Sequence, residues 1–226
     1  MRGVADLGRG RRRPGPRPSL RRVDVVRAAL AEGLDPLSMS AVARRLGVSH
    51  STLYRYVEDR NALLVAAVDL AVREWAWPPA DLPWRELLEG FTESLWDFLE
   101  AHAGMAPAIS SIAGVPPAIL ELASTYTAAL EAAGLSQRDS VLAYDFIADL
   151  AIAQSMAMKG LDETVETEQG PRSRREVHQA SLSGILGDHP ALTDPRTWTG
   201  RGWLDQKVEL LLDGLAQRVP DGATTD

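Results

Sequence analysis

The chain has 226 residues, of which 45% are hydrophobic and 24% are charged, and its formal net charge is −7 at pH 7. A chain of this length forms one or two domains, and the hydrophobic fraction is sufficient for a buried core. Cysteine is absent, which excludes disulfides and thiolate metal sites and is compatible with a reducing cytoplasm.

The charge is unevenly distributed along the chain. Residues 1–60 hold 13 arginines and six acidic residues, a net charge of +7, whereas residues 61–226 hold 11 basic and 25 acidic residues, a net charge of −14. A positive N-terminal region attracts a polyanion, while the negative remainder is repelled by it. The overall acidity is therefore no argument against a nucleic-acid partner.

Residues 1–18 are predicted to form a disordered basic arm. The first 22 residues contain eight arginines together with Pro14, Pro16 and Pro18, and they show no apolar periodicity. No apolar core follows these basic residues, so the arm does not resemble a signal peptide. Its arginines either lie in the minor groove or along the backbone of a nucleic acid, or form a solvated tail with only non-specific attraction.

Two short helices are predicted after the arm. Val23, Val26 and Leu30 form an apolar stripe at spacings of three and four, which predicts a helix over 20–32 that ends at Gly33. Ser38 is placed to cap a helix over 39–46, whose last residue is followed by Gly47. Glycine adopts the left-handed helix end without a steric penalty. The sequence therefore predicts a tight turn at this glycine.

A third helix is expected after the glycine turn, with Ser49 as its cap and with Leu53 and Val57 on its buried side. The side chains left exposed are those of His50, Ser51, Thr52, Tyr54, Arg55 and Tyr56. Such groups bond to base edges or phosphates in a major groove. Any helical hairpin has caps and a glycine turn, but an exposed Tyr-Arg-Tyr favours phosphates over packing. Residues 19–66 are thus predicted to be a helix-turn-helix DNA-binding domain.

Three stretches carry a resemblance to a known family: Leu46-Gly47-Val48-Ser49, Thr52-Leu53-Tyr54-Arg55-Tyr56-Val57 and Arg60-Asn61-Ala62-Leu63-Leu64. Over residues 20–66 the chain resembles the tetracycline-repressor (TetR) family of one-component transcriptional regulators. The resemblance implies base contacts from His50, Ser51, Thr52 and Arg55. It implies phosphate contacts from Tyr54, Tyr56 and Arg60, with Ser38 and Ser40 as further DNA-binding candidates. The acidic pair Glu58-Asp59 departs from the family's pattern and weakens the local positive field.

The remainder of the chain is predicted to be helical. The expected helices span 60–77, 83–101, 104–112, 117–133, 137–160, 174–186 and 203–218, and the polar stretch 161–174 is expected to be a loop. We find no alternating strand pattern. The predicted fold is all-α, with an N-terminal three-helix helix-turn-helix head, a larger helical ligand-binding and dimerisation body over 67–218, and a disordered tail over 219–226.

Helix 137–160 is apolar on nearly every side, so one face is expected to pack inward and another to meet a second subunit. The family resemblance implies that helices 137–160 and 203–218 form a two-fold, four-helix interface. A homodimer with two heads would bind a palindromic operator in double-stranded DNA. Asp145 and Asp149 lie on one face of the long helix, where they either pair with a cationic ligand or a partner's arginine, or form a solvated or interfacial stripe.

The helices that surround the family's ligand cavity carry many aromatic residues. The candidate ligand-binding residues are Trp75, Phe91, Trp96, Phe98, Tyr126, Tyr144, Phe146 and Met156. A pocket lined in this way suits an unknown, largely apolar small-molecule effector. The alternative is that these residues form core, in which case the body binds a protein partner or no ligand at all. A fully packed core would favour that alternative.

Enzymatic functions find no support in the sequence. It contains no glycine-rich phosphate loop, no nucleophile elbow and no His-Glu-x-x-His pair, and its four histidines are scattered. We therefore predict no catalytic residue, no metal site and no cofactor. No uninterrupted run approaches the roughly 18 to 20 apolar residues of a membrane span, so we expect a soluble, cytoplasmic protein without a membrane partner. The predicted function is a repressor released from its operator by a small molecule.

The first testable prediction concerns salt. Binding to DNA is expected to weaken steeply as salt rises, because each phosphate that an arginine neutralises releases condensed counterions. Titrations of the purified protein against a DNA fragment at two salt concentrations measure the effect. An affinity that does not change between them would contradict a role for the basic N-terminal region.

Overall fold

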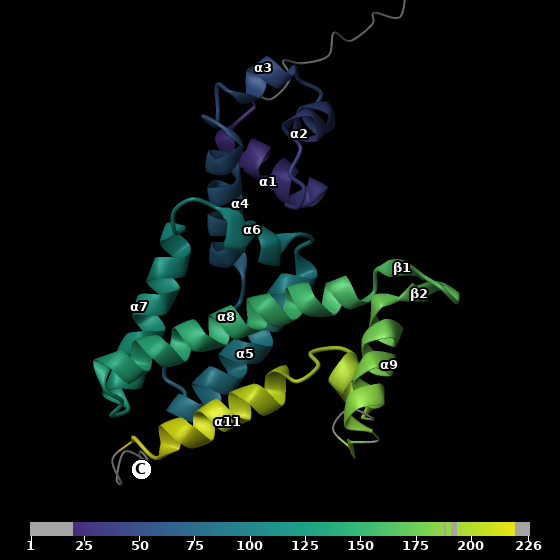
Figure 1. The fold of residues 1–226 in the computed structure, drawn as a ribbon. Helices are drawn as coiled ribbons and strands as arrows, with labels where there is room; N and C mark the ends of the chain where they lie inside the picture. Colours follow the sequence, from purple (N-terminus) through teal and green to yellow (C-terminus); the bar gives the residue numbers. More distant parts are fainter. Residues whose placement is uncertain (1–19, 188, 191–193, 220–226) are drawn as a thin grey trace, which may run out of the picture.

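The computed structural model describes residues 20–187, 189–190 and 194–219. The predicted arm over 1–18 and all but the first residue of the predicted tail lie outside the described residues. The all-α prediction is confirmed: the chain forms a small head, made of α1 (Arg22–Glu32), α2 (Met39–Leu46) and α3 (His50–Leu53), on a larger helical body (Figure 1). Helix α4 (Arg60–Glu74) runs from the head into the body.

The core of the head forms where α1 packs against both α2 and α4. Val25 and Ala29 are fully buried and Val26 is nearly so, whereas Val23 and Leu30 of the predicted stripe are only half-buried. The difference arises because two neighbouring helices cover two adjoining faces of α1. Helix α2 matches its prediction: the Ser38 hydroxyl accepts a hydrogen bond from the Ala41 amide at 3.2 Å, and Gly47 ends the helix with a φ of 66°.

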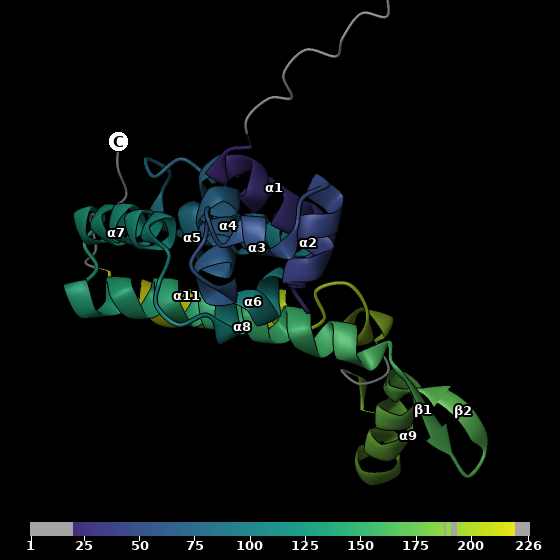
Figure 2. The ribbon, with the colours of Figure 1, turned by 90° about the horizontal axis from the view of Figure 1, so that it is seen from above.

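The body is built around the long helix α8 (Gln137–Leu161). Helices α5 (Trp84–Ala101), α6 (Met105–Ser111), α7 (Pro117–Ala132) and α11 (Leu204–Ala216) all pack against it. Seen from above, the head stands over the middle of α8 (Figure 2). Helix α4, which carries the head, contacts α6 and α7, and both of these pack against α8. The position of the head therefore depends on how these helices pack against α8.

Helix α4 ends at Glu74, three residues before its predicted end. Trp75 has extended backbone angles, and the indole N–H of Trp77 donates to the Val72 carbonyl at 2.8 Å. Pro78 follows, and the residue before a proline is driven out of the helical conformation. The chain therefore leaves α4 early and lays both tryptophan rings against the body.

The inner face of α8 is formed by Ser140, Ala143, Ile147, Ala151, Ser155 and Met158, which are buried at spacings of three and four residues. Its outer face leaves large apolar side chains exposed, among them Leu142 at 48% and Phe146 at 50%. Helix α8 is also long and apolar enough to cross a membrane, a property that core helices of soluble proteins share. Only 28% of its most apolar 18-residue stretch is buried. One chain therefore covers α8 incompletely.

The predicted loop over 161–174 was wrong. Strands β1 (Thr164–Thr167) and β2 (Gly170–Ser173) pair antiparallel, with Thr164 opposite Ser173 and Thr167 opposite Gly170. β-branched residues in β1 favour the extended conformation, and the Thr167 hydroxyl donates to the Gly170 carbonyl across the turn at 2.7 Å. The strands are too short and polar to show the alternation expected of a half-buried strand.

The hairpin leads into α9 (Arg174–Leu186), which is followed by the short 3-10 helix η1 (Pro195–Trp198). Ser173 and Glu176 close a capping box at the start of α9. No side chain described in α9 is buried, and the hairpin and α9 project from one end of α8 (Figure 2). This end of the body is therefore an open, lightly packed region.

Two further contacts fix the head to the body beside α4. The Leu34 amide donates to the Ala103 carbonyl at 2.9 Å, and Gly104, with a φ of +79°, lies so close that an added Cβ would be 2.3 Å from the Asp35 nitrogen. The Asn61 side chain also bonds to the backbone of Ala113, donating at 3.3 Å and accepting at 3.0 Å. The body is thus joined to the segment that follows α1 and to the first turn of α4.

We expect Gly104→Ala to lower the free energy of unfolding by about 1–3 kcal/mol, because the new methyl group overlaps backbone atoms and the backbone angle is unfavourable for alanine. Chemical denaturation measures the change. Gly160→Ala is the control: Gly160 is helical and has no atom within 4 Å of an added Cβ, so stability should be unchanged or slightly higher. Equal stability of Gly104→Ala and wild type would contradict a tight head–body junction.

Candidate functional site

Helix α3 lies at the end of the head farthest from α8 and α11 (Figure 1). Leu53 is fully buried and Val57 nearly so, and these two side chains anchor the segment to the head. On its outer side His50, Ser51, Tyr54 and Arg55 are exposed, and Thr52 and Tyr56 are half-buried. The six predicted DNA-binding residues of this segment thus lie close together in the chain, but the prediction of one helix that carries them all was wrong. Helix α3 is a single turn that ends at Leu53, and Tyr54, Arg55 and Tyr56 lie in the turn that follows it.

The hydroxyl groups at the start of α3 bond to one another. Ser49 occupies the N-cap position, but the prediction that its side chain caps the helix was wrong. Its Oγ lies 3.0 Å from Ser51 Oγ and 2.7 Å from Thr52 Oγ1. A hydroxyl that is held in this way both donates and accepts, so these groups are able to exchange their mutual bonds for bonds to base edges or phosphates.

The remaining predicted DNA-binding residues lie beside α3. Ser38 and Ser40 are exposed at the start of α2. Arg60 donates through Nε to the Leu37 carbonyl at 3.1 Å, which ties the start of α4 to the start of α2. The acidic departure from the family's pattern has a structural reason at Asp59, whose carboxylate accepts from the Ala62 amide at 2.7 Å and caps α4.

The cations of the head fall into two groups. Arg21, Arg27 and Arg45 form ion pairs with Asp24, Glu74 and Glu32. Among the described residues, no carboxylate lies within 4.0 Å of the guanidinium groups of Arg22, Arg44, Arg55 and Arg60, which leaves their charge available to an anion. Six of the 13 arginines before position 61 belong to residues 1–19, outside the described part of the chain.

Five of the predicted ligand-binding residues meet in one aromatic cluster: Trp75, Phe91, Phe98, Tyr126 and Tyr144. The rings of Phe91 and Tyr144 are stacked with centroids 4.9 Å apart, and the Tyr126 hydroxyl donates to the Pro78 carbonyl at 2.7 Å. Burial raises the pKa of Tyr126 to about 12, so its hydroxyl remains a neutral donor at physiological pH. In this conformation the rings cover one another.

The predicted ligand-binding set omitted two members of the aromatic cluster, Trp77 and His102. Trp77 lies 5.4 Å from Phe98, and His102 lies 4.7 Å from it, both measured between ring centroids. A helix that continued to residue 77, as the sequence predicts, would turn Trp75 and Trp77 to different sides. In the extended segment that follows Glu74, both rings reach the same group of side chains.

Three predicted ligand-binding residues do not join the aromatic cluster. Trp96 is buried but makes none of its ring contacts, and Phe146 and Met156 are 50% and 43% exposed on the outer side of α8. The structure therefore does not bring the predicted set together in one place. Phe146 lines a different feature, a groove between α8 and α11.

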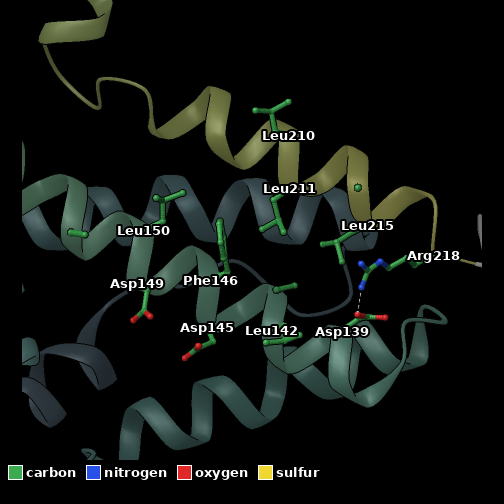
Figure 3. A pocket seen from close by; sticks show the side chains of 13 residues that line it. Asp139, Leu142, Asp145, Phe146, Asp149, Leu150, Leu210, Leu211, Leu215 and Arg218 are labelled. Atoms are coloured by element: carbon green, nitrogen blue, oxygen red, sulfur yellow. Dashed lines mark hydrogen bonds and ion pairs between the residues drawn. The ribbon is translucent and has the colours of Figure 1, made fainter. Parts of the chain in front are cut away.

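The groove between α8 and α11 has a volume of about 630 Å³ (Figure 3). Phe146 points from α8 towards α11, where Leu211 and Leu215 lie opposite (Figure 3). Asp145 and Asp149 are exposed on α8, which agrees with a solvated or interfacial stripe. Arg218 and Asp139 close one end of the groove with an ion pair of 2.6 Å. Because the groove is continuous with the exposed apolar outer face of α8, it resembles half of an interface more than a ligand cavity.

Comparisons with known proteins agree with this geometry. The model of bacterial regulatory proteins of the tetR family matches residues 26–67. Over 209 residues the chain is 30% identical to the tetracycline repressor protein class A from transposon 1721 of Escherichia coli, which covers 86% of this chain and 89% of that protein. It is 40% identical over 100 residues to the HTH-type transcriptional repressor DrrR1 of Streptomyces coeruleorubidus, which covers 40% of this chain but only 37% of DrrR1.

The fold is also that of ActR from Streptomyces coelicolor. Apo ActR superimposes with a TM-score of 0.70 at 22% identity, which covers 90% of this chain and 98% of that chain. ActR in complex with actinorhodin gives a TM-score of 0.68 at 24% identity, which covers 91% and 99%. At these identities the likeness shows a shared fold.

Two substitutions separate base contacts from phosphate contacts. Arg55→Ala should change the preferred DNA sequence and lower affinity for the best site by roughly 10- to 100-fold, the range for a lost base contact. Tyr56→Phe should weaken binding to all sequences alike by roughly fivefold, because it removes one hydroxyl and keeps the packed ring. Selection from a randomised DNA library measures both. Unchanged affinity of Tyr56→Phe would count against its phosphate contact.

Proposed function

Because this chain belongs to the TetR family of bacterial regulatory proteins, we propose that it is a homodimeric, sequence-specific transcriptional repressor that a small molecule releases from a palindromic operator in double-stranded DNA. The observation that carries the proposal is the segment formed by α3 and the turn after it, which two buried side chains anchor and which exposes serine, tyrosine, histidine and arginine at the tip of the head. In this account residues 19–66 bind DNA in the cytoplasm, and residues 67–218 dimerise and bind the effector.

Dimerisation is assigned to the outer face of α8 and to α11. Leu142, Phe146 and Leu210 are exposed there by 48%, 50% and 75%, and the groove between the helices is apolar. Pairing of this face with the same face of a second copy buries these side chains around a two-fold axis. Two α3 helices would then enter major grooves about one helical turn, or a multiple of it, apart.

Release by an effector needs a connection between body and head. Helix α4 starts beside α2, is tied to the body by Asn61 and ends in the aromatic cluster. Arg73 adds an ion pair to Glu121 of α7 at 2.6 Å. A ligand that favours one arrangement of α5, α7 and α8 would move α4 and thereby the head, provided that it binds the two arrangements with different affinities. The complex of ActR with actinorhodin supports a small-molecule ligand for a protein of this fold.

The packed aromatic cluster supports a second candidate function. Its rings are in mutual contact, so a ligand placed among them would have to separate them. A body without a ligand would act as a constitutive DNA-binding regulator or as a protein-interaction module. The two candidates differ in one observable, the change of operator affinity when a small molecule binds.

The effector proposal is tested by adding aromatic small molecules to the protein bound to its operator. At least one molecule that binds the protein should lower operator affinity, because it stabilises a different spacing of the heads. Operator affinity that is the same with and without every bound molecule would contradict the proposal and favour the constitutive regulator.

We expect Phe146→Glu to convert the dimer to monomers and to lower operator affinity by at least roughly 10-fold, because a charge replaces an apolar side chain at the centre of the proposed interface. Sedimentation and operator titration measure the two effects. Leu120→Glu, which places the same charge at a 57% exposed leucine of α7, is the matched control and should remain dimeric. A Phe146→Glu protein that stays dimeric would place the interface elsewhere.

A further inference from the structure

The C-terminal end of α8, α9, η1 and the start of α11 lie together at one end of the body (Figure 1). Residues from all four elements line a second hollow. Its volume is about 600 Å³, within the range of small-molecule sites. The apolar part of its lining consists of Met156, Met158, Leu161, Leu182, Trp198 and Trp203. Exposed fractions of 38% for Trp203 and 43% for Met156 leave an indole and a thioether available to an apolar ligand.

Among the described residues, the charged side chains that line this hollow are those of Arg174 and Lys207, and none of the lining residues is an aspartate or a glutamate. His178 also belongs to the lining. Over residues 61–226 acidic groups outnumber basic ones by 25 to 11, so the hollow reverses the balance of its surroundings. An anion is therefore favoured here and repelled by most of the body's surface.

Lys207 is the cation that lacks a counter-charge. Arg174 is paired with Glu163 at 2.7 Å, but the Lys207 ammonium donates to the neutral amide oxygen of Gln154 at 3.0 Å. Lys207 is half-buried, and no carboxylate of the described residues lies within 4.0 Å of its nitrogen. An ammonium that has lost part of its hydration gains most from an anionic partner.

The surrounding groups hold this arrangement in place. An added Cβ on Gly202 would lie 2.7 Å from the Gln154 amide nitrogen, so glycine leaves the space in which Gln154 meets Lys207. The Trp203 indole N–H donates to Thr197 Oγ1 at 3.0 Å, which fixes the ring at the edge of the hollow. His178 Nδ1 lies 2.9 Å from the Arg174 carbonyl. Because a carbonyl only accepts, Nδ1 carries the hydrogen and Nε2 is directed elsewhere.

We propose that this hollow binds a planar, largely apolar carboxylic acid, with its ring against Trp203 and Met156 and its carboxylate accepting from the Lys207 ammonium. Binding of such an acid does not depend on the proposed function; only its identification as the effector that releases the operator does. Lys207 lies four residues before Leu211 on the same side of α11, and Leu211 lines the α8–α11 groove. A ligand at Lys207 would therefore lie at the end of the proposed dimer interface, where it can alter how the two subunits meet.

The test compares two isosteric probes, 2-naphthoate and its neutral amide 2-naphthamide, by calorimetry on the full chain. Wild type should bind the acid more tightly than the amide. Lys207→Gln should weaken binding of the acid about tenfold and leave the amide unchanged, the loss expected for one charge-assisted hydrogen bond. Lys207→Arg should retain most of the affinity. Lys159→Gln removes the chain's other lysine, which pairs with Glu100 outside the hollow, and should behave as wild type.

Three outcomes would overturn the site. One is equal affinity of wild type and Lys207→Gln for the acid, and another is the absence of binding by both 2-naphthoate and a larger anthracene carboxylate. The third is a weaker dimer in Lys207→Gln by sedimentation, which would show that Lys207 pairs with a carboxylate of a second copy. Binding of the wild-type protein to operator DNA is measured in parallel without either probe. If the wild type does not bind the operator, the proposed function is contradicted. If it does bind the operator but neither acid binds the protein, only the proposed ligand site is contradicted.

Discussion

The fold depends on one constraint: helix α8 is apolar on more sides than a single chain covers. Its inner face, which carries small residues such as Ala143 and Ala151, allows α5 and α7 to approach closely. Its outer face keeps Phe146 half-exposed in a groove with α11. Exposed apolar surface of this kind marks an interaction site, which is why we assign the face to a second copy. Dimerisation, head spacing and operator symmetry all follow from that assignment.

The position of the head relative to α8 is determined by the contacts that α4 makes at its two ends. Helix α4 carries the position of the head into the body. Its N-terminal end is fixed by the Asp59 cap and by the Arg60 bond to Leu37, and the chain beyond its C-terminal end enters the aromatic cluster. A shift among the rings around Trp75 would thus reach α3 through a rigid helix and not through a flexible linker. This arrangement suits a regulator whose binding body and DNA-binding head must change together.

Local sequence patterns predicted most of the helices and the helix ends of the head. The Ser38 cap, the Gly47 turn and the buried Leu53 and Val57 follow from local chemistry, and the structure has all of them. The prediction failed where distant contacts decide. Helix α4 ends early because of where the indole rings of Trp75 and Trp77 pack, which the local sequence does not determine. The hairpin over 164–173 is polar and lacks the alternation of apolar and polar residues by which a strand is predicted. Whether eight aromatic or methionine side chains meet in one pocket depends on which side of its own element each occupies and on how those elements pack. Tyr144 and Phe146 are two residues apart and so lie on different sides of α8, but the sequence alone does not say which of these sides faces the body.

The central claim is that two heads of one dimer bind one symmetric DNA site. Selection of genomic fragments on the purified full-length protein tests it most directly. The account predicts enrichment of a single palindrome whose half-sites are about one helical turn, or a multiple of it, apart. Capture that depends on salt but enriches no sequence, or enrichment of a site without two-fold symmetry, would contradict it. In the first case the basic N-terminal region would account for binding, and the protein would be a non-specific DNA binder; in the second case it would bind a specific site without two-fold symmetry.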